Sequence, residues 1–215
     1  MKTIIFARIV DMKYYKGITD TDKPAENMAY VKETGDAHEA YNFDPVELDG
    51  EEICLGFVML IGNSANTDLQ IRLENMIGCR QSKKVESIDD VTVVWCAKDP
   101  SGTNTMRVVG FYKNATAYRY AQQCTFLDDN NEVSYIQQFN FTAKKEDCVV
   151  LPSSERNRRE WIVPTSGKGG YNFGFGRANI WFANSHGEND KEDEYVAKML
   201  ERIESYSGEN WMEVQ

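Results

Sequence analysis

The chain has 215 residues, of which 41% are hydrophobic and 12% aromatic, and its formal net charge is −10. A chain of this size and composition can bury a packed core without disulfides or a structural metal, which excludes a globally disordered protein. The acidic balance also disfavours simple non-specific binding to DNA.

Residues 2–10 are rich in β-branched and aromatic side chains and predict a buried first strand. Residues 19–43 are polar and predict a long loop, with a short helix near residues 26–31. A strongly apolar strand is expected at residues 53–62. Residues 69–77 fit the spacing of a strand and of a helix, and both alternatives stay open.

Residues 91–97 predict a central strand, which a turn at residues 99–102 joins to a partner strand at residues 106–112. A second strand pair is expected at residues 117–127 and 133–141, joined by the polar cluster Asp-Asp-Asn-Asn. The pattern of the middle of the chain is therefore that of consecutive β-hairpins.

Residues 148–151 predict a short strand, and the polar residues 153–160 predict about one helical turn. Residues 167–176 hold five glycines and favour an irregular loop before a last strand at residues 179–183. The most regular helix is expected at residues 189–206. Its apolar residues share one face: Val196, Met199, Leu200 and Ile203.

Many strands with few helices predict an α+β fold that is predominantly β. We expect either a curled sheet or a PUA-like barrel, decorated by short helices and a C-terminal helix. The chain is interpreted as a single domain over residues 1–215, with a core over residues 2–183 and an amphipathic helix at about residues 189–206.

The charges are distributed unevenly along the chain. Residues 104–127 contain three bases and no acid, and residues 144–177 contain seven bases and four acids, so a local basic face is compatible with the acidic total. Chance clustering on a solvated surface is the alternative.

The cysteines point to a cytoplasmic protein. Their number, five, is odd, and no two of them form a CxxC pair, which suits a reducing compartment and disfavours a zinc site. No apolar run reaches the roughly 18 residues of a membrane span.

Sequence motifs for nucleotide hydrolysis, metalloproteolysis or serine hydrolysis are missing. The nearest approach to a P-loop, at Gly167-Lys168, has Ile162 in place of the first glycine and Gly169 in place of the hydroxyl residue. The adjacent pair His38-Glu39 could supply acid–base chemistry, but two residues are a weak signal. We therefore expect no catalytic residue, no metal and no cofactor.

Several segments place aromatic rings beside amides or cations. Tyr112-Lys113-Asn114 is expected to end a strand in a polar turn, Arg177 and Trp181 follow the glycine-rich loop, and Tyr14 stands near the end of the first strand. A base stacked on an aromatic ring gains roughly 1–3 kcal/mol, amides read base edges, and cations hold phosphates. The alternative is that the aromatic residues fill the core.

Six segments occur in an order that resembles an N-terminal domain of bacterial defence proteins, often found ahead of an HNH or other nuclease domain. They are IIFARIVDMKYYKG, AHEAYNF, VTVVWCA, VVGFYKNATAYR, LPSSER and GFGRANIWFA. Phe111 stands where the family pattern has tryptophan, and Gly176-Arg177-Ala178 where it has Gly-Gln-Ser. The resemblance implies restriction of foreign DNA with a fused or separate nuclease partner. A looser analogy to PUA-like, EVE and YTH domains implies recognition of a flipped, modified base.

The resulting hypothesis is a DNA-binding module that recognises a modified or flipped base as the specificity domain of a restriction or anti-phage system. Its expected base-binding residues are Trp95, Tyr112, Lys113, Asn114, Trp181 and Tyr14, and its expected phosphate contacts are Arg119, Arg156 and Arg177. The alternative is a protein that binds a nucleotide second messenger or another small nucleotide. A third hypothesis is an enzyme acting on nucleic acid through His38-Glu39.

Overall fold

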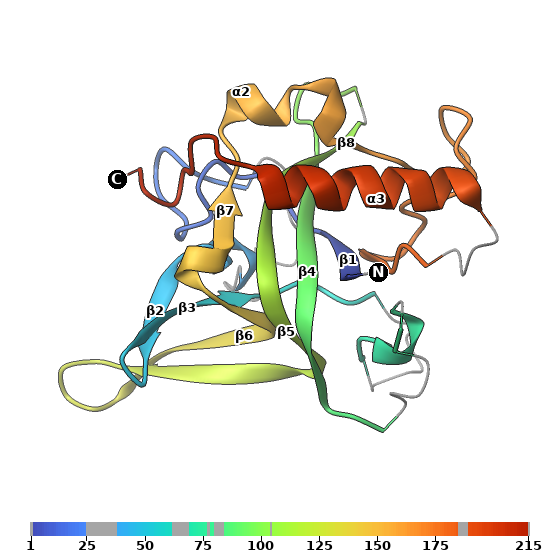
Figure 1. Cartoon of the computed structure of the whole chain (residues 1–215). Coiled ribbons are helices and arrows are strands. Elements are labelled where there is room, and N and C mark those ends of the chain that lie inside the picture. The colour runs from blue at the N-terminus through green and yellow to red at the C-terminus, as the bar shows by residue number, and fades with distance from the viewer. Residues whose placement is uncertain are drawn as a thin grey trace.

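A computed structural model describes residues 2–24, 38–61, 69–76, 78–79, 84–103, 105–184 and 189–214. These residues form an α+β fold dominated by one mixed sheet, as predicted (Figure 1). The strand order is β2-β3-β6-β5-β4-β1-β9, and β7 and β8 each pair with β5. The sheet does not close, so the curled-sheet alternative is confirmed and the barrel alternative is not.

The strands are β1 (Thr3–Arg8), β2 (Pro45–Leu48), β3 (Glu51–Gly56), β4 (Ser87–Lys98), β5 (Met106–Leu127), β6 (Val133–Lys144), β7 (Cys148–Val150), β8 (Ile162–Val163) and β9 (Ile180–Trp181). The α-helices are α2 (Ser153–Arg156) and α3 (Asp190–Ser205). Short 3₁₀ helices are η1 (His38–Tyr41), η2 (Leu73–Asn75), η3 (Lys145–Asp147) and η4 (Arg159–Trp161).

Strand β5 is 22 residues long and organises the sheet. Its first part pairs with β4, β7 and β8, and its last part pairs with β6. Between the two parts, Asn114 has a φ of +50° and the register with β4 shifts, which are the marks of a β-bulge. The expected turn at Asn114 is therefore wrong, because the strand bends there and continues.

Both faces of the sheet are buried. In β1, Ile5 and Ala7 point into one hydrophobic cluster, while Ile4 and Phe6 point into the other. Helix α3 covers the second face, where Met199 is fully buried (Figure 1). This burial on both faces explains why β1 is apolar at consecutive positions rather than at alternate ones.

The bounds of the other elements agree to different degrees with the bounds predicted from the sequence. Helix α3 lies within the predicted range, and the side chain of Asn189 caps it by accepting from the backbone N–H of Glu192. Strand β3 ends at Gly56, short of the predicted limit. The ambiguous residues 69–77 contain the 3₁₀ helix η2. The helix predicted near residues 26–31 lies outside the described residues.

Candidate functional site

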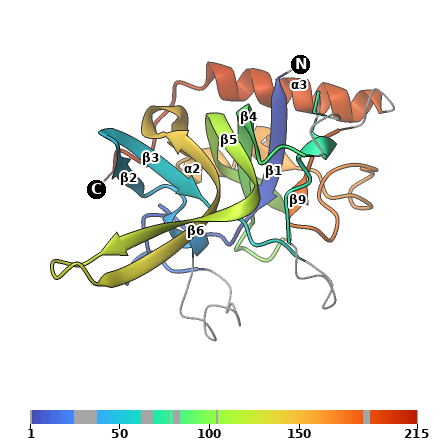
Figure 2. The same cartoon turned by 90° about the horizontal axis from the view of Figure 1, so that it is seen from below.

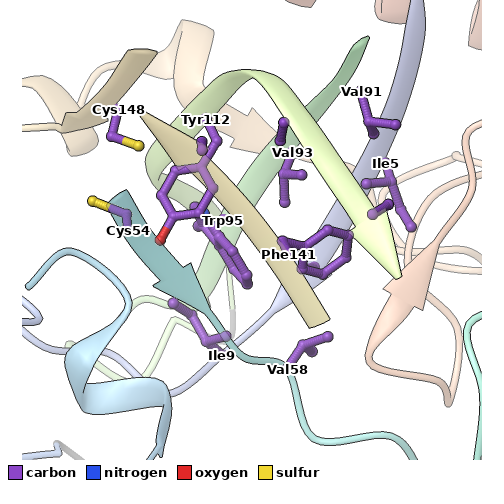
Figure 3. Packing of buried hydrophobic residues seen from close by; sticks show 14 of the residues in the cluster. Ile5, Ile9, Cys54, Val58, Val91, Val93, Trp95, Tyr112, Phe141 and Cys148 are labelled. Atoms are coloured by element: carbon purple, nitrogen blue, oxygen red, sulfur yellow. The ribbon is translucent and has the colours of Figure 1, made fainter. Parts of the chain in front are cut away.

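The three aromatic residues expected to enclose a base do not bound a common pocket. Trp95 and Tyr112 are completely buried in the cluster on one face of the sheet, whereas Trp181 is buried in the cluster on the other face. Figure 3 shows the rings of Trp95, Tyr112 and Phe141 packed together, with ring centroids 5.2 and 5.5 Å from that of Trp95. The base-stacking roles expected for Trp95, Tyr112 and Trp181 are therefore corrected to core packing.

The polar groups of two of these rings are used within the protein. The Tyr112 hydroxyl donates to the backbone carbonyl of Asn42, and burial raises the pKa of Tyr112. The indole N–H of Trp181 donates to Glu192 in α3 at 3.2 Å. The first bond holds the segment around Asn42 against β5, and the second holds β9 against α3. Both bonds therefore stabilise the fold.

Lys113 and Asn114 lie at the bulge of β5. Asn114 is exposed and donates to the carboxylate of Asp147 at 2.9 Å. Lys113 is half-buried. Neither residue lines the cleft that lies at the ends of β1 and β4.

Arg119 is buried and bound within the protein. Its guanidinium donates to the backbone carbonyl of Val85 at 2.9 Å and forms an ion pair with Glu74 at 2.9 Å. The expected phosphate contact by Arg119 is corrected to an internal bridge. Arg177 is exposed at the surface, and its proposed contact with phosphate stays a prediction.

Arg156 is also buried, and its guanidinium donates to three backbone carbonyls. The acceptors are Leu151 at 2.7 Å, Met12 at 2.6 Å and Lys13 at 2.6 Å. Its primary role is therefore to clamp the segment after β1 against the segment after β7, rather than to bind phosphate as expected. The clamp also forms one wall of a cleft.

This cleft has a volume of about 440 Å³ and lies where β1 and β4 end. The two strands are parallel neighbours, so the charged residues that follow each of them meet at one edge of the sheet. Ligands of open sheets typically bind outside the carboxyl ends of parallel strands. The cleft is thus of a size and in a position suited to a small ligand.

Half of the residues that line the cleft carry charged side chains. The bases are Lys13, Lys23, Lys98, Arg107 and Arg156, and the acids are Asp11, Asp22 and Asp99. Ser101, Ser153 and Asn157 add neutral hydrogen-bonding groups. The five bases outnumber the three acids, in contrast to the net charge of −10 of the whole chain.

Two of the acids are engaged by neighbouring groups. The Asp22 carboxylate accepts from the backbone N–H groups of Lys13 and Tyr14, each at 2.7 Å. Asp99 accepts from Ser101 and from Arg107, and these hydrogen bonds lower its pKa to about 2. The hydrogen bonds of Asp22 and those of Asp99 fix the loops that form the cleft.

Asp11 differs from the other two acids. Its carboxylate lies 3.9 Å from the Arg156 guanidinium, but desolvation outweighs this attraction and raises the pKa of Asp11 to about 6. The cleft therefore loses a negative charge when the pH falls below about 6.

Beside the cleft lies an aromatic pair formed by Tyr14 and Trp211. Their ring centroids are 5.2 Å apart, and both side chains are half-buried. The ammonium of Lys13, a residue of the cleft lining, lies 4.6 Å from the Tyr14 ring centroid and 5.2 Å from that of Trp211. Of the six predicted base-binding residues, Tyr14 is thus the one placed beside the cleft.

The pair His38-Glu39 lies in η1, apart from the cleft. Both side chains are buried, and the Nδ1 atom of His38 is 3.0 Å from the hydroxyl of Tyr135. The Glu39 carboxylate accepts from the backbone N–H groups of Val10 and Met59, and burial raises its pKa to about 7. These contacts fix η1 against the segments after β1 and β3.

No protein-family model matches the chain, and comparisons with curated proteins and solved structures also gave no match.

Within the described ranges, no group of three or more His, Cys, Asp or Glu side chains is placed to hold a metal ion. No helix among these residues is both long and apolar enough to cross a membrane. All five cysteines are free thiols.

Proposed function

We propose that the chain binds a nucleotide in the cleft at the ends of β1 and β4. The observation that carries the proposal is the charge reversal: a lining of five bases and three acids on a chain of net charge −10. A local positive potential within an acidic protein attracts a compact anion more effectively than it attracts a long duplex.

The cations that suit the phosphate are Lys13 and Lys98, because both are exposed at the cleft. Arg107 and Arg156 are engaged by Asp99 and by backbone carbonyls, so they contribute charge from the cleft wall. Ser101 and Ser153 offer hydroxyl groups to phosphate oxygens or to a ribose.

The Tyr14–Trp211 pair suits the base. Its half-buried rings leave part of their surface open to a stacked base, and Lys13 connects the pair to the cleft. An alanine substitution of an aromatic residue that stacks on a base typically costs about 1–3 kcal/mol of binding energy.

The nucleotide can be free or can belong to a DNA strand. We favour a free nucleotide in a cytoplasmic protein, because the aromatic pocket expected for a flipped base is filled by core packing. The restriction role, the nuclease partner and the lack of a catalytic site in this chain stay predictions of the sequence.

The proposal is tested by isothermal titration calorimetry with AMP, cyclic AMP, cyclic GMP, single-stranded DNA and duplex DNA. We expect Lys13→Gln and Lys98→Gln each to weaken nucleotide binding about tenfold, equivalent to about 1.4 kcal/mol. Lys191→Gln, an exposed position on α3, is the control and should leave affinity unchanged. Binding of duplex DNA without binding of free nucleotides would show that the nucleotide bound in the cleft belongs to DNA. No binding of any probe at low salt would refute the proposal.

The pH dependence provides a second test. A cyclic nucleotide is the suitable probe, because its phosphodiester keeps one negative charge across the range examined. As the pH falls from about 7.5 to 5.5, Asp11 becomes protonated and the cleft becomes more positive, so affinity should rise. Asp11→Asn should abolish this rise. A pH dependence that is identical in the variant would contradict the assignment of Asp11 to the ligand site.

A further inference from the structure

Residues 120–138 form an arm, in which β5 and β6 extend as a two-stranded ribbon beyond the rest of the sheet (Figure 1, Figure 2). Within the part of the chain that the structure describes, β5 pairs only with β6 from Gln122 to Leu127. The consecutive residues Gln122 and Gln123 are both exposed, although they point to opposite faces. The β5 strand of the arm is therefore solvated on both faces, whereas Gln137 of β6 is buried and donates to the backbone carbonyl of Leu55.

The arm combines apolar exposure with an open strand edge. Leu127 and Val133 are 55% and 61% exposed, and Tyr120 and Ile136 are each 41% exposed. Isolated two-stranded ribbons are marginally stable in water, and exposed edges are usually protected by lysine, proline or a covering segment. Residues 120–143 contain neither lysine nor proline. Such an edge is suited to accept an additional strand.

The outer edge of β5 is the more accessible of the two. On the β6 side, the backbone N–H of Gln138 donates to His38, so η1 occupies part of that edge. The segment from Gln122 to Leu127 would pair with about 20 Å of extended chain, given a rise of about 3.3 Å per residue.

The charge of the arm indicates the chemistry of the strand that it would accept. Asp128, Asp129 and Glu132 are clustered at the tip, and residues 120–143 contain no base. A second copy of this chain would bring another negatively charged molecule against the arm, which charge repulsion opposes. An extended segment that carries lysine or arginine is complementary.

We propose that the arm docks an extended, positively charged segment of a partner protein, which adds as a strand to the outer edge of β5. Backbone hydrogen bonds would supply affinity, and Leu127 and Val133 would contact alternate apolar side chains of the segment. This surface is at the opposite end of β5 from Arg107, which lines the cleft, so the partner and a cleft ligand should bind without competing.

The test is selection of random ten-residue peptides displayed on phage against the immobilised full chain, followed by fluorescence anisotropy with the enriched synthetic peptides. We expect enriched peptides to alternate apolar residues and to carry lysine or arginine. The double variant Leu127→Ser, Val133→Ser should weaken their binding at least tenfold. Leu48→Ser, at a 40% exposed position on β2, is the matched control and should bind as the unmodified chain does.

Circular dichroism and urea unfolding of both variants would establish that they are folded. Replacing the bases of an enriched peptide with glutamate should also weaken binding at least tenfold. Enrichment that does not depend on the arm, or enriched peptides without basic residues, would overturn the proposal. It would equally be overturned if light scattering showed a dimer of the unmodified chain that the double variant abolishes, since the occupant would then be a second copy.

Discussion

At the scale of single residues, Arg156 joins segments that are 144 residues apart in the sequence. A lysine cannot reproduce its planar set of donors, so at least one of the carbonyls of Met12, Lys13 and Leu151 would lose its partner. A buried polar group without a partner costs about 1–3 kcal/mol. We therefore expect Arg156→Lys to lower the free energy of unfolding by about 1–3 kcal/mol, measured by urea denaturation.

The matched control for this substitution is Arg158→Lys. The Arg158 side chain is 58% exposed and pairs with Glu155 at 2.9 Å, so its replacement should change stability by less than about 0.5 kcal/mol. Equal losses in the two variants would show that the three carbonyl bonds of Arg156 do not hold the cleft wall together.

The cleft could be anticipated only in part from single residues. The sequence predicts Tyr14 as a base-binding residue near the end of the first strand, and this side chain is half-buried beside the cleft. The contribution of Asp11, Lys98 and Trp211 was missed, because no local pattern shows that β1 and β4 are parallel neighbours. The signal that was present is the charged pair that follows each strand, namely Asp11 with Lys13 and Lys98 with Asp99.

At the scale of elements, apolar runs predict β1 and β4, and apolar residues at helical spacing predict α3, because burial determines the side chains of these segments. The long strand β5 was predicted as two strands separated by a turn. Asn is common in turns and also tolerates positive φ, so its presence at position 114 is compatible with both a turn and a bulge. Pairing with β4 decides between these outcomes, and that pairing is not a local property of the sequence.

The close approach of β5 to its neighbours explains the glycine at position 110. A Cβ atom there would lie 2.5 Å from the Phe43 ring and 2.5 Å from the backbone oxygen of Val149. Since the oxygen belongs to the paired strand β7, the clash cannot be relieved by a rotamer change alone. We expect Gly110→Ala to lower the free energy of unfolding by about 1–3 kcal/mol, measured by urea denaturation.

Gly176→Ala is the control for this effect. Nothing lies within 4 Å of a Cβ atom at Gly176, and its φ is not in the positive range that disfavours side chains. The substitution should be neutral or stabilise the protein by up to about 1 kcal/mol. A loss at Gly176 as large as that at Gly110 would indicate that backbone conformation, rather than the clash with Phe43 and Val149, causes the effect.

At the scale of the whole molecule, the two hydrophobic clusters share the same strands, because consecutive residues of β1 point into opposite clusters. Neither cluster can therefore be lost while β1 keeps its structure, and the described sheet should unfold as one cooperative unit. This expectation also tests the single-domain interpretation of the sequence. The suitable variants are Ile5→Ala in one cluster and Met199→Ala in the other, each expected to cost about 2–5 kcal/mol.

Both variants should shift one common transition when tryptophan fluorescence and far-ultraviolet circular dichroism are followed during urea unfolding. Fluorescence monitors both clusters through Trp95 and Trp181, and circular dichroism monitors α3 together with the sheet. Glu201→Ala on the exposed side of α3 should leave the midpoint nearly unchanged. If Met199→Ala separated the two signals into distinct transitions, α3 would be an independent cover of the sheet, and the clusters would not form a single cooperative core.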